Sequence, residues 1–362
     1  MPLPDDLRDE CSLVRDPAAF RGSELEAAAA RRLDSLLKPP GSLGRLEEIA
    51  RTLHVIQGSA PLRVRPARVY VICADHGIMD QCVSSQPREV TALLMRGFLA
   101  GGLGINCLCR SVDAQALLVD AGCAACMPEH PQLIRAKIAP GTADMSLGPA
   151  MSAEQCLAAL RLGVELAAQA QRDGVRALGT GEIGIGNSTV ATALFCACLG
   201  FAPEEICGMG AGCPPGGIEH KISVIRKALR HNEVAVRDAD PVAALSAFGG
   251  FEIIALAGLI IGAAARSIPV MVDGFISTAA FVAACRLAPA ARFYCFFSHA
   301  SAEAGHVKIL RRLGVKPFFD LGMRLGEGTG AALGFTLLDG AASVFNDMLT
   351  LESAGVVIPA GG

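Results

Sequence analysis

The sequence predicts an α/β protein in which a parallel, Rossmann-like sheet is covered by helices on both faces. Short runs rich in Val, Ile or Phe end abruptly in Gly, Asp, Ser or His, and an Ala- or Leu-rich stretch usually follows. This alternation is typical of parallel strands joined by crossover helices, because such strands are buried on both faces. The chain of 362 residues is 52% hydrophobic and 19% charged, so it can bury a large core.

The first elements are expected to be helical. Ser23–Leu37 and Leu43–Gln57 have helical patterns, and Pro39 and Pro40 separate them. From residue 66 onward six strands are predicted: Arg68–Ala74, Gln115–Asp120, Val175–Gly179, Glu205–Gly208, Ile268–Val272 and Phe293–Phe297.

The C-terminal stretch Ala331–Ala354 is again predicted to be helical, with apolar residues at helical spacing. We expect the two ends of the chain to pack together. Residues 1–65 and 331–362 would then form a small helical lobe beside a large α/β domain of residues 66–330.

Composition argues against several classes of protein. The net charge is −3 and no basic run stands out, which disfavours nucleic acid as a partner. The longest uncharged apolar run, Ile253–Ala265, is shorter than the about 20 residues of a membrane span. The acidic N-terminus does not resemble a signal peptide, so a cytoplasmic location is expected.

The chain has 14 Cys but no pattern typical of a metal site. Cys123 and Cys126 form a CxxC pair without a second pair to complete a zinc site. Other cysteines lie in apolar stretches, where Cys behaves as a small hydrophobic residue. We expect buried thiols, no metal and no cofactor; a redox or metal-binding role of the CxxC pair is the less favoured alternative.

Polar motifs follow the predicted strands at the edge where ligands bind in open α/β sheets. The richest is the glycine-rich stretch Gly179–Thr189, which leads into a helix expected from Val190, with Asn187 or Ser188 as its N-cap. Glycines before a helix N-terminus expose N–H groups that can hold a phosphate. An ordinary βα turn has the same composition, and both interpretations stay open.

A second informative motif places Glu327 between two glycines at the entry to the C-terminal helix. Partial burial would raise its pKa toward neutrality, as a general base needs. A carboxylate favoured by the helix dipole is the alternative interpretation. The residue types alone do not separate the two.

Five motifs together resemble the nicotinate-nucleotide:dimethylbenzimidazole phosphoribosyltransferase family, in order and from about residue 30 to the C-terminus. The motifs are Lys38–Glu47, Ala74–Gly77, Gly181–Thr189, Asp273–Ser277 and Arg324–Gly330. The resemblance implies transfer of phosphoribose from nicotinate mononucleotide to an aromatic lower-ligand base or phenol, for cobamide synthesis. It also implies a dimer, formed either by two copies or with a paralogue.

The resemblance also suggests roles for individual residues. Glu327 matches the catalytic base, and Glu182 matches a second active-site glutamate beside the ribose. The phosphate pocket would be formed by Gly184, Gly186, Asn187, Ser188, Lys221 and Arg324. The acceptor side would carry Ser84, Gln86 and Arg88, the last where Gln is usual. Departure of nicotinate turns the cationic pyridinium into a neutral pyridine ring, so the resemblance implies that neither a general acid nor a metal is required.

Some positions depart from the family pattern. Polar or charged residues of the family are replaced at Met209, Ala211, Pro214, Pro215 and Ala300. In the family pattern an Arg stands at the positions of Met209 and Ala300, and its loss removes a bidentate anion contact that Lys does not replace. The alternative to an active enzyme is therefore a weakly active or non-catalytic subunit that completes a heterodimer with a paralogue.

Overall fold

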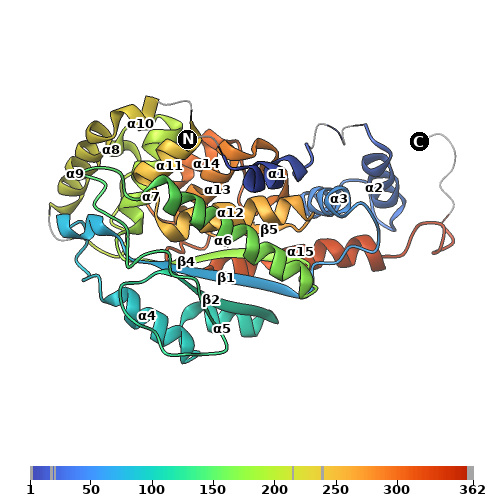
Figure 1. The fold of residues 1–362 in the computed structure, drawn as a ribbon. Helices are drawn as coiled ribbons and strands as arrows, with labels where there is room; N and C mark the ends of the chain where they lie inside the picture. The colour runs from blue at the N-terminus through green and yellow to red at the C-terminus, as the bar shows by residue number, and fades with distance from the viewer. Residues whose placement is uncertain (1–2, 17–18, 20–21, 214–215, 238–239, 357–362) are drawn as a thin grey trace.

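At the centre of the molecule lies a six-stranded sheet in the order β3-β2-β1-β4-β5-β6, in which every paired strand is parallel (Figure 1). The computed structural model describes residues 3–16, 19, 22–213, 216–237 and 240–356. The strands are β1 (Ala67–Ala74), β2 (Ala114–Gly122), β3 (Leu133–Arg135), β4 (Ala177–Ile183), β5 (Val270–Val272) and β6 (Cys295–Phe297). The predicted fold class is confirmed.

Helices cover both faces of this sheet. On one face α12 (Phe251–Ala265) and α13 (Phe275–Leu287) contact the strands, and α6 (Ala153–Arg172) packs on α12. On the other face lie α4 (Val90–Leu99), α5 (Gly104–Ser111) and α15 (Thr329–Asp347) (Figure 1). α12 is buried along nearly its whole length because it lies between the sheet and α6.

Residues 24–57 lie beside the C-terminal segment of the chain. α2 (Glu24–Ser35) packs on α3 (Arg45–Gln57), and α3 packs on α15. The amide of Leu37 donates to the carbonyl of Leu349 at 2.8 Å, and that of Leu351 donates to Ser35 at 2.9 Å. α1 (Asp5–Leu13) instead packs on α12 and α6. The division into a lobe of residues 1–65 and 331–362 and a domain of residues 66–330 stays a prediction.

The remaining helices are short or lie around the carboxyl edge of the sheet. They are η2 (Gly77–Gln81), α7 (Asn187–Leu199), α8 (Pro203–Ile206), α9 (Gly217–His231), α10 (Glu233–Arg237), α11 (Pro241–Phe248), η3 (Pro289–Tyr294) and α14 (His306–Leu313).

One predicted strand is wrong. Residues 205–208 contain the end of α8 and an irregular segment instead of a strand. Pro203 occupies the first turn of α8, where its missing N–H costs nothing, and Glu205 accepts a hydrogen bond from the amide of Ala202 at 2.8 Å. These two local features start a helical turn. The other five predicted runs overlap observed strands. β3 was not predicted because Leu133 and Ile134 are its only apolar residues and polar residues flank them, so no Val-, Ile- or Phe-rich run marks it.

Two element ends also differ from expectation. β4 continues beyond the predicted end at Gly179 through Glu182 to Ile183, so residues 180–183 belong to the strand instead of the loop. The C-terminal helix ends at Asp347 instead of 354, because the following residues pair with residues 35–37.

Among the described residues, the segment Val90–Ser111 is long and apolar enough to cross a membrane by length and composition alone. In the structure it forms two helices, α4 and α5, joined by a turn at residues 100–103. Both helices pack on the sheet, which explains their apolar residues as part of the core.

Candidate active site

A pocket of about 340 Å³ opens at the carboxyl ends of β4, β5 and β6. This edge lies beside the point where the strand order reverses between β1 and β4, the usual ligand site of open parallel sheets. The titratable and polar residues that line it are Glu182, Asn187, Ser188, Asp273, His299, Ser301, Glu303, Arg324 and Glu327.

Glu182 comes from the end of β4 and is 7% exposed. Its carboxylate accepts a hydrogen bond from the side-chain amide of Asn187. Burial raises the pKa of Glu182 well above its ordinary value; the neighbouring carboxylates, Asp273 foremost, raise it further, and Asn187 opposes them. A Cβ placed on Gly326 would lie 2.5 Å from Glu182 Oε1, so Glu182 reaches the loop that carries Glu327.

Glu327 lies just before α15 in a left-handed backbone conformation, with φ 61°. Gly326 and Gly328 on either side also have positive φ, and this favours glycine at both positions. The side chain is 6% exposed, and its Oε2 accepts from the amide of Ile105 at the start of α5, at 3.4 Å. Burial raises the pKa of Glu327, and the Ile105 hydrogen bond opposes that rise.

The start of α7 and the loop before it form another wall, through Gly184, Asn187 and Ser188. The expected N-cap is wrong: Gly186, with φ 97°, occupies the N-cap position, and α7 starts at Asn187 instead of Val190. The Asn187 side chain is turned toward Glu182 instead of capping the helix. Gly186 itself does not line the pocket; a Cβ there would meet Met79 Sδ at 2.9 Å.

The two predicted cations occupy different places. Lys221 on α9 is 1% exposed, and its Nζ donates to Ser188 Oγ at 2.9 Å and to the Gly208 carbonyl at 3.0 Å. It therefore joins α7 to the loop that follows α8, behind the pocket wall. Arg324 lines the pocket and is exposed, at the mouth.

The three predicted acceptor residues lie outside the pocket lining. Ser84 Oγ accepts from the amide of Gln86 at 3.2 Å, and Arg88 pairs with Asp80 at 2.6 Å. Their loop contacts the segment that carries the lining residue Ala211: the amide of Ser85 donates to the Gly212 carbonyl at 3.1 Å. An acceptor role for Ser84, Gln86 and Arg88 stays a prediction.

The altered loop after α8 is held from the far side of the pocket. Ala211 lines the pocket, whereas Met209 is exposed. Glu303 Oε1 accepts from the amide of Gly210 at 3.0 Å, which fixes the loop without the polar residues that it lacks. Pro214 and Pro215 lie outside the described residues.

Sequence reasoning gave no role to three residues that line the pocket, Asp273, Ser301 and Glu303. Asp273 directly follows β5, as Glu182 ends β4, so its position at the carboxyl edge was the available signal. His299 lines the pocket, whereas His76 is not part of its lining. His76 is fully buried, with Nε2 3.0 Å from Oε1 of the equally buried Glu252.

Within the described ranges, no three His, Cys, Asp or Glu side chains are grouped so as to hold a metal ion. Cys123 is buried and Cys126 is exposed, and both are free thiols.

Known proteins resemble this chain over most of its length. A family model described as "Phosphoribosyltransferase" matches residues 21–356. A nicotinate-nucleotide–dimethylbenzimidazole phosphoribosyltransferase of Oleidesulfovibrio alaskensis is 54% identical over 92% of this chain and 94% of its own. The protein of the same name from Geobacter sulfurreducens is 44% identical over the same shares of the two chains. The crystal structure of CobT from Thermus thermophilus superposes with a TM-score of 0.87 at 38% identity, covering 92% of this chain and 99% of that one.

Proposed function

The chain belongs to the nicotinate-nucleotide–dimethylbenzimidazole phosphoribosyltransferase family, and we propose on this basis how its pocket transfers phosphoribose from nicotinate mononucleotide to dimethylbenzimidazole. The product is the ribotide that supplies the lower ligand of a cobamide. The observation that carries the proposal is the placement of Glu327, a buried carboxylate with a raised pKa at one wall of the pocket.

The reaction exchanges one glycosidic bond for another. A nitrogen of dimethylbenzimidazole attacks C1′ of the ribose, and the bond from C1′ to the pyridinium nitrogen breaks with its electron pair going to nicotinate. Attack from the side opposite the leaving group inverts C1′ and gives the α-ribotide. Departure of nicotinate neutralises the pyridinium, so no acid has to protonate the leaving group.

Glu327 removes the proton that the attacking base still carries after bond formation. A base works best when its pKa lies near the working pH, and burial shifts Glu327 in that direction. The amide of Ile105 orients the carboxylate within the pocket wall. Glu327 and the attacking nitrogen are thus held together, which lowers the entropic part of the barrier.

Glu182 binds the ribose hydroxyls of the donor. Its carboxylate is oriented by Asn187 and lies against the loop that carries Glu327. Both carboxylates would also stabilise positive charge on the donor as the glycosidic bond breaks.

The phosphate of the donor lies at the N-terminus of α7, against Gly184, Asn187 and Ser188. Lys221 supports this wall through Ser188 and adds positive charge behind it. Arg324 at the mouth supplies a second cation. This function needs no metal or cofactor, and we expect the enzyme to work in the cytoplasm as a dimer.

The function is tested by incubating the purified chain with nicotinate mononucleotide and dimethylbenzimidazole and measuring nicotinate and ribotide by mass spectrometry. We expect the wild-type chain to form the ribotide. Glu327→Gln should lower kcat by roughly 100-fold or more, the scale for a positioned base. Glu165→Gln, an exposed change on α6, serves as the matched control and should keep full activity.

Undiminished turnover by Glu327→Gln would remove the role of this residue. A folded wild-type chain that forms ribotide only after a paralogous subunit is added would support the second candidate, a supporting subunit of a heterodimer. The observation that favours this second candidate is the uncharged pocket wall at Ala211.

A further inference from the structure

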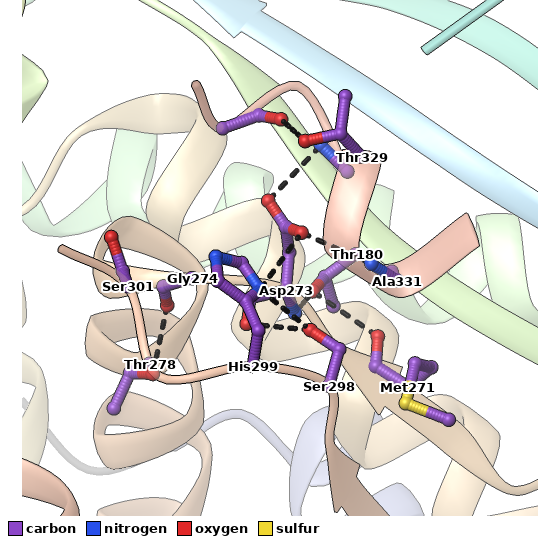
Figure 2. Close-up of polar contacts among 12 residues, drawn as sticks. Thr180, Met271, Asp273, Gly274, Thr278, Ser298, His299, Ser301, Thr329 and Ala331 are labelled. Carbon is purple, nitrogen blue, oxygen red and sulfur yellow. Dashed lines mark hydrogen bonds and ion pairs between the residues drawn. The ribbon is translucent and has the colours of Figure 1, made fainter. Parts of the chain in front are cut away.

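Asp273, the residue after β5, is fixed by both neighbouring strands. Its amide donates to Thr180 Oγ1 on β4 at 3.0 Å, and its carbonyl accepts from Ser298 Oγ, just after β6, at 3.0 Å. The side chain is 1% exposed, and Figure 2 shows its carboxyl directed toward the start of α15. The backbone of Asp273 is therefore rigid, and its side chain leaves the sheet in one defined direction.

Both carboxyl oxygens of Asp273 accept hydrogen bonds from the first turn of α15. Oδ2 accepts from the amide of Gly328 at 3.2 Å, and Oδ1 accepts from that of Ala331 at 3.0 Å. Amides in the first turn of a helix lack partners within the helix, and an anion is favoured there. Asp273 thus caps α15 from a strand that is 55 residues away in the sequence from Gly328.

The close approach of α15 to Asp273 depends on Gly330. A Cβ at Gly330 would lie 2.8 Å from Asp273 Oδ1 and 2.1 Å from His299 Nδ1. No other residue type would let the helix end come so near to both side chains.

The capped turn begins directly after Glu327. Gly326, Glu327 and Gly328 have φ of 79°, 61° and 89°, and a non-glycine residue keeps such a conformation only when its surroundings hold it. Gly181 on β4 supports the turn from one side, since a Cβ there would lie 2.6 Å from the Glu327 carbonyl oxygen. Asp273 holds the residue that follows.

We propose that Asp273 is a positioning residue for Glu327: by binding the amides of Gly328 and Ala331, its carboxylate holds the backbone turn that aims the Glu327 side chain into the pocket. The inference rests on the proposed role of Glu327 as the base. The amide of Ile105 orients the side chain of Glu327, whereas Asp273 fixes the backbone that follows Glu327.

The charges around Asp273 are mostly negative. Glu327 and Glu182 line the same pocket, and Glu252, outside its lining, acts electrostatically on Glu182. His299 Nδ1 is 3.9 Å from Oδ1, but burial lowers the pKa of His299, so it brings no full positive charge at neutral pH. Burial raises the pKa of Asp273 to about 7, and the amides of Ala331, Gly328 and Gly330 oppose that rise. The α15 amides are therefore the groups that favour the carboxylate form.

The test is a double-mutant cycle of Asp273→Asn and Glu327→Gln, with kcat, KM for nicotinate mononucleotide and the Kd of this donor measured for each variant. Asn at position 273 keeps the shape but replaces one acceptor oxygen by a donor group. We expect Asp273→Asn alone to lower kcat by roughly 10- to 100-fold, the loss that follows from a small misplacement of a reacting group. Donor Kd should change little.

Combined with Glu327→Gln, the Asp273→Asn change should lower kcat no further, because residues that act as a unit give non-additive losses. A purely structural role, or direct contact of Asp273 with substrate, would multiply the two losses and would overturn the proposal. The matched control is Asp120→Asn, which changes a buried carboxylate that accepts from the Cys123 amide at 2.9 Å, outside the pocket lining. It should keep kcat.

Ser298→Ala provides a second, milder cycle should Asp273→Asn not fold. It removes the hydroxyl that binds the Asp273 carbonyl and should lower kcat only when Glu327 is present. Equal losses with and without Glu327 would again refute the proposal. Full activity of Glu327→Gln would refute the role of Glu327 as the base, and the inference with it. Reduced activity of Glu327→Gln together with full activity of Asp273→Asn would refute the inference alone.

Discussion

At the scale of single residues, the pocket gathers carboxylates in a place where water is largely excluded. Glu182, Asp273 and Glu327 line it, each less than one-tenth exposed, and Glu252 lies behind. Each of the three lining groups is partnered by amide N–H groups, from Asn187, from α15 or from Ile105. This arrangement leaves the pocket complementary to a donor that carries positive charge at its reacting end.

The raised pKa of Glu327 predicts the pH dependence of the reaction. A base accepts a proton only when ionised, so activity should fall as the pH drops through its pKa. Because burial raises that pKa, the midpoint of the acid limb of kcat/KM should lie above 4.5, the ordinary value for Glu. The groups that face Glu327 are Glu182, Asp273 and the Ile105 amide.

The check is a profile of kcat/KM between pH 4.5 and 9, with circular dichroism to show that the protein stays folded. In Glu327→Gln the limb that belongs to Glu327 should vanish. A midpoint at or below 4.5 would contradict the burial argument.

At the scale of elements, the sheet and the helix pair α6 and α12 form the rigid frame of the site. α6 and α12 approach so closely that a Cβ at Gly163 would lie 1.9 Å from the Ala255 carbonyl oxygen. A Cβ at Gly258 would lie 2.1 Å from the Leu160 carbonyl oxygen. The two glycines thus set the distance between these helices.

Gly163→Ala should therefore destabilise the protein by about 3 kcal/mol, the upper end of the range for overpacking, because backbone atoms have to move. Gly340→Ala on α15 is the matched control, since a Cβ there meets nothing within 4 Å. It should stabilise the protein by about 0.5–1 kcal/mol through helix propensity. Urea unfolding of both variants measures the difference, and equal effects would refute this account of the helix contact.

At the scale of the whole molecule, burial determines which thiols can react. All 14 Cys are free; Cys82, Cys107 and Cys126 are exposed, and six others are buried. Burial raises the pKa of Cys156 and Cys196, for example, to about 12, so neither forms thiolate at neutral pH.

A thiol reagent at pH 7.5 should therefore label three cysteines quickly in the native protein and the buried six only after unfolding. Peptide mass spectrometry identifies the labelled positions. Fast labelling of Cys123, which is buried beside the exposed Cys126, would show that the fold around this CxxC pair is open.

The sequence alone determined the fold class, because strand and helix patterns record which side chains are buried. Five predicted strand runs overlap observed strands, and both N-terminal helices formed within two residues of their predicted ends. The motifs around Glu182 and Glu327 also lie at the pocket wall, because the carboxyl ends of parallel strands converge at one edge of the sheet. Residues 205–208 were mistaken for a strand, because four residues are too few to separate a buried strand from a helical turn.

Only the tertiary structure decided how the site is held together. Asp273 meets Gly328 and Ala331, Glu303 meets Gly210, and Lys221 meets Ser188, in each case across at least 33 residues of chain. Periodicity and local spacing carry no information about such contacts. They arise when crossover helices bring separate strand ends to one edge of the sheet, where hydrogen bonds satisfy the polar groups that become buried there.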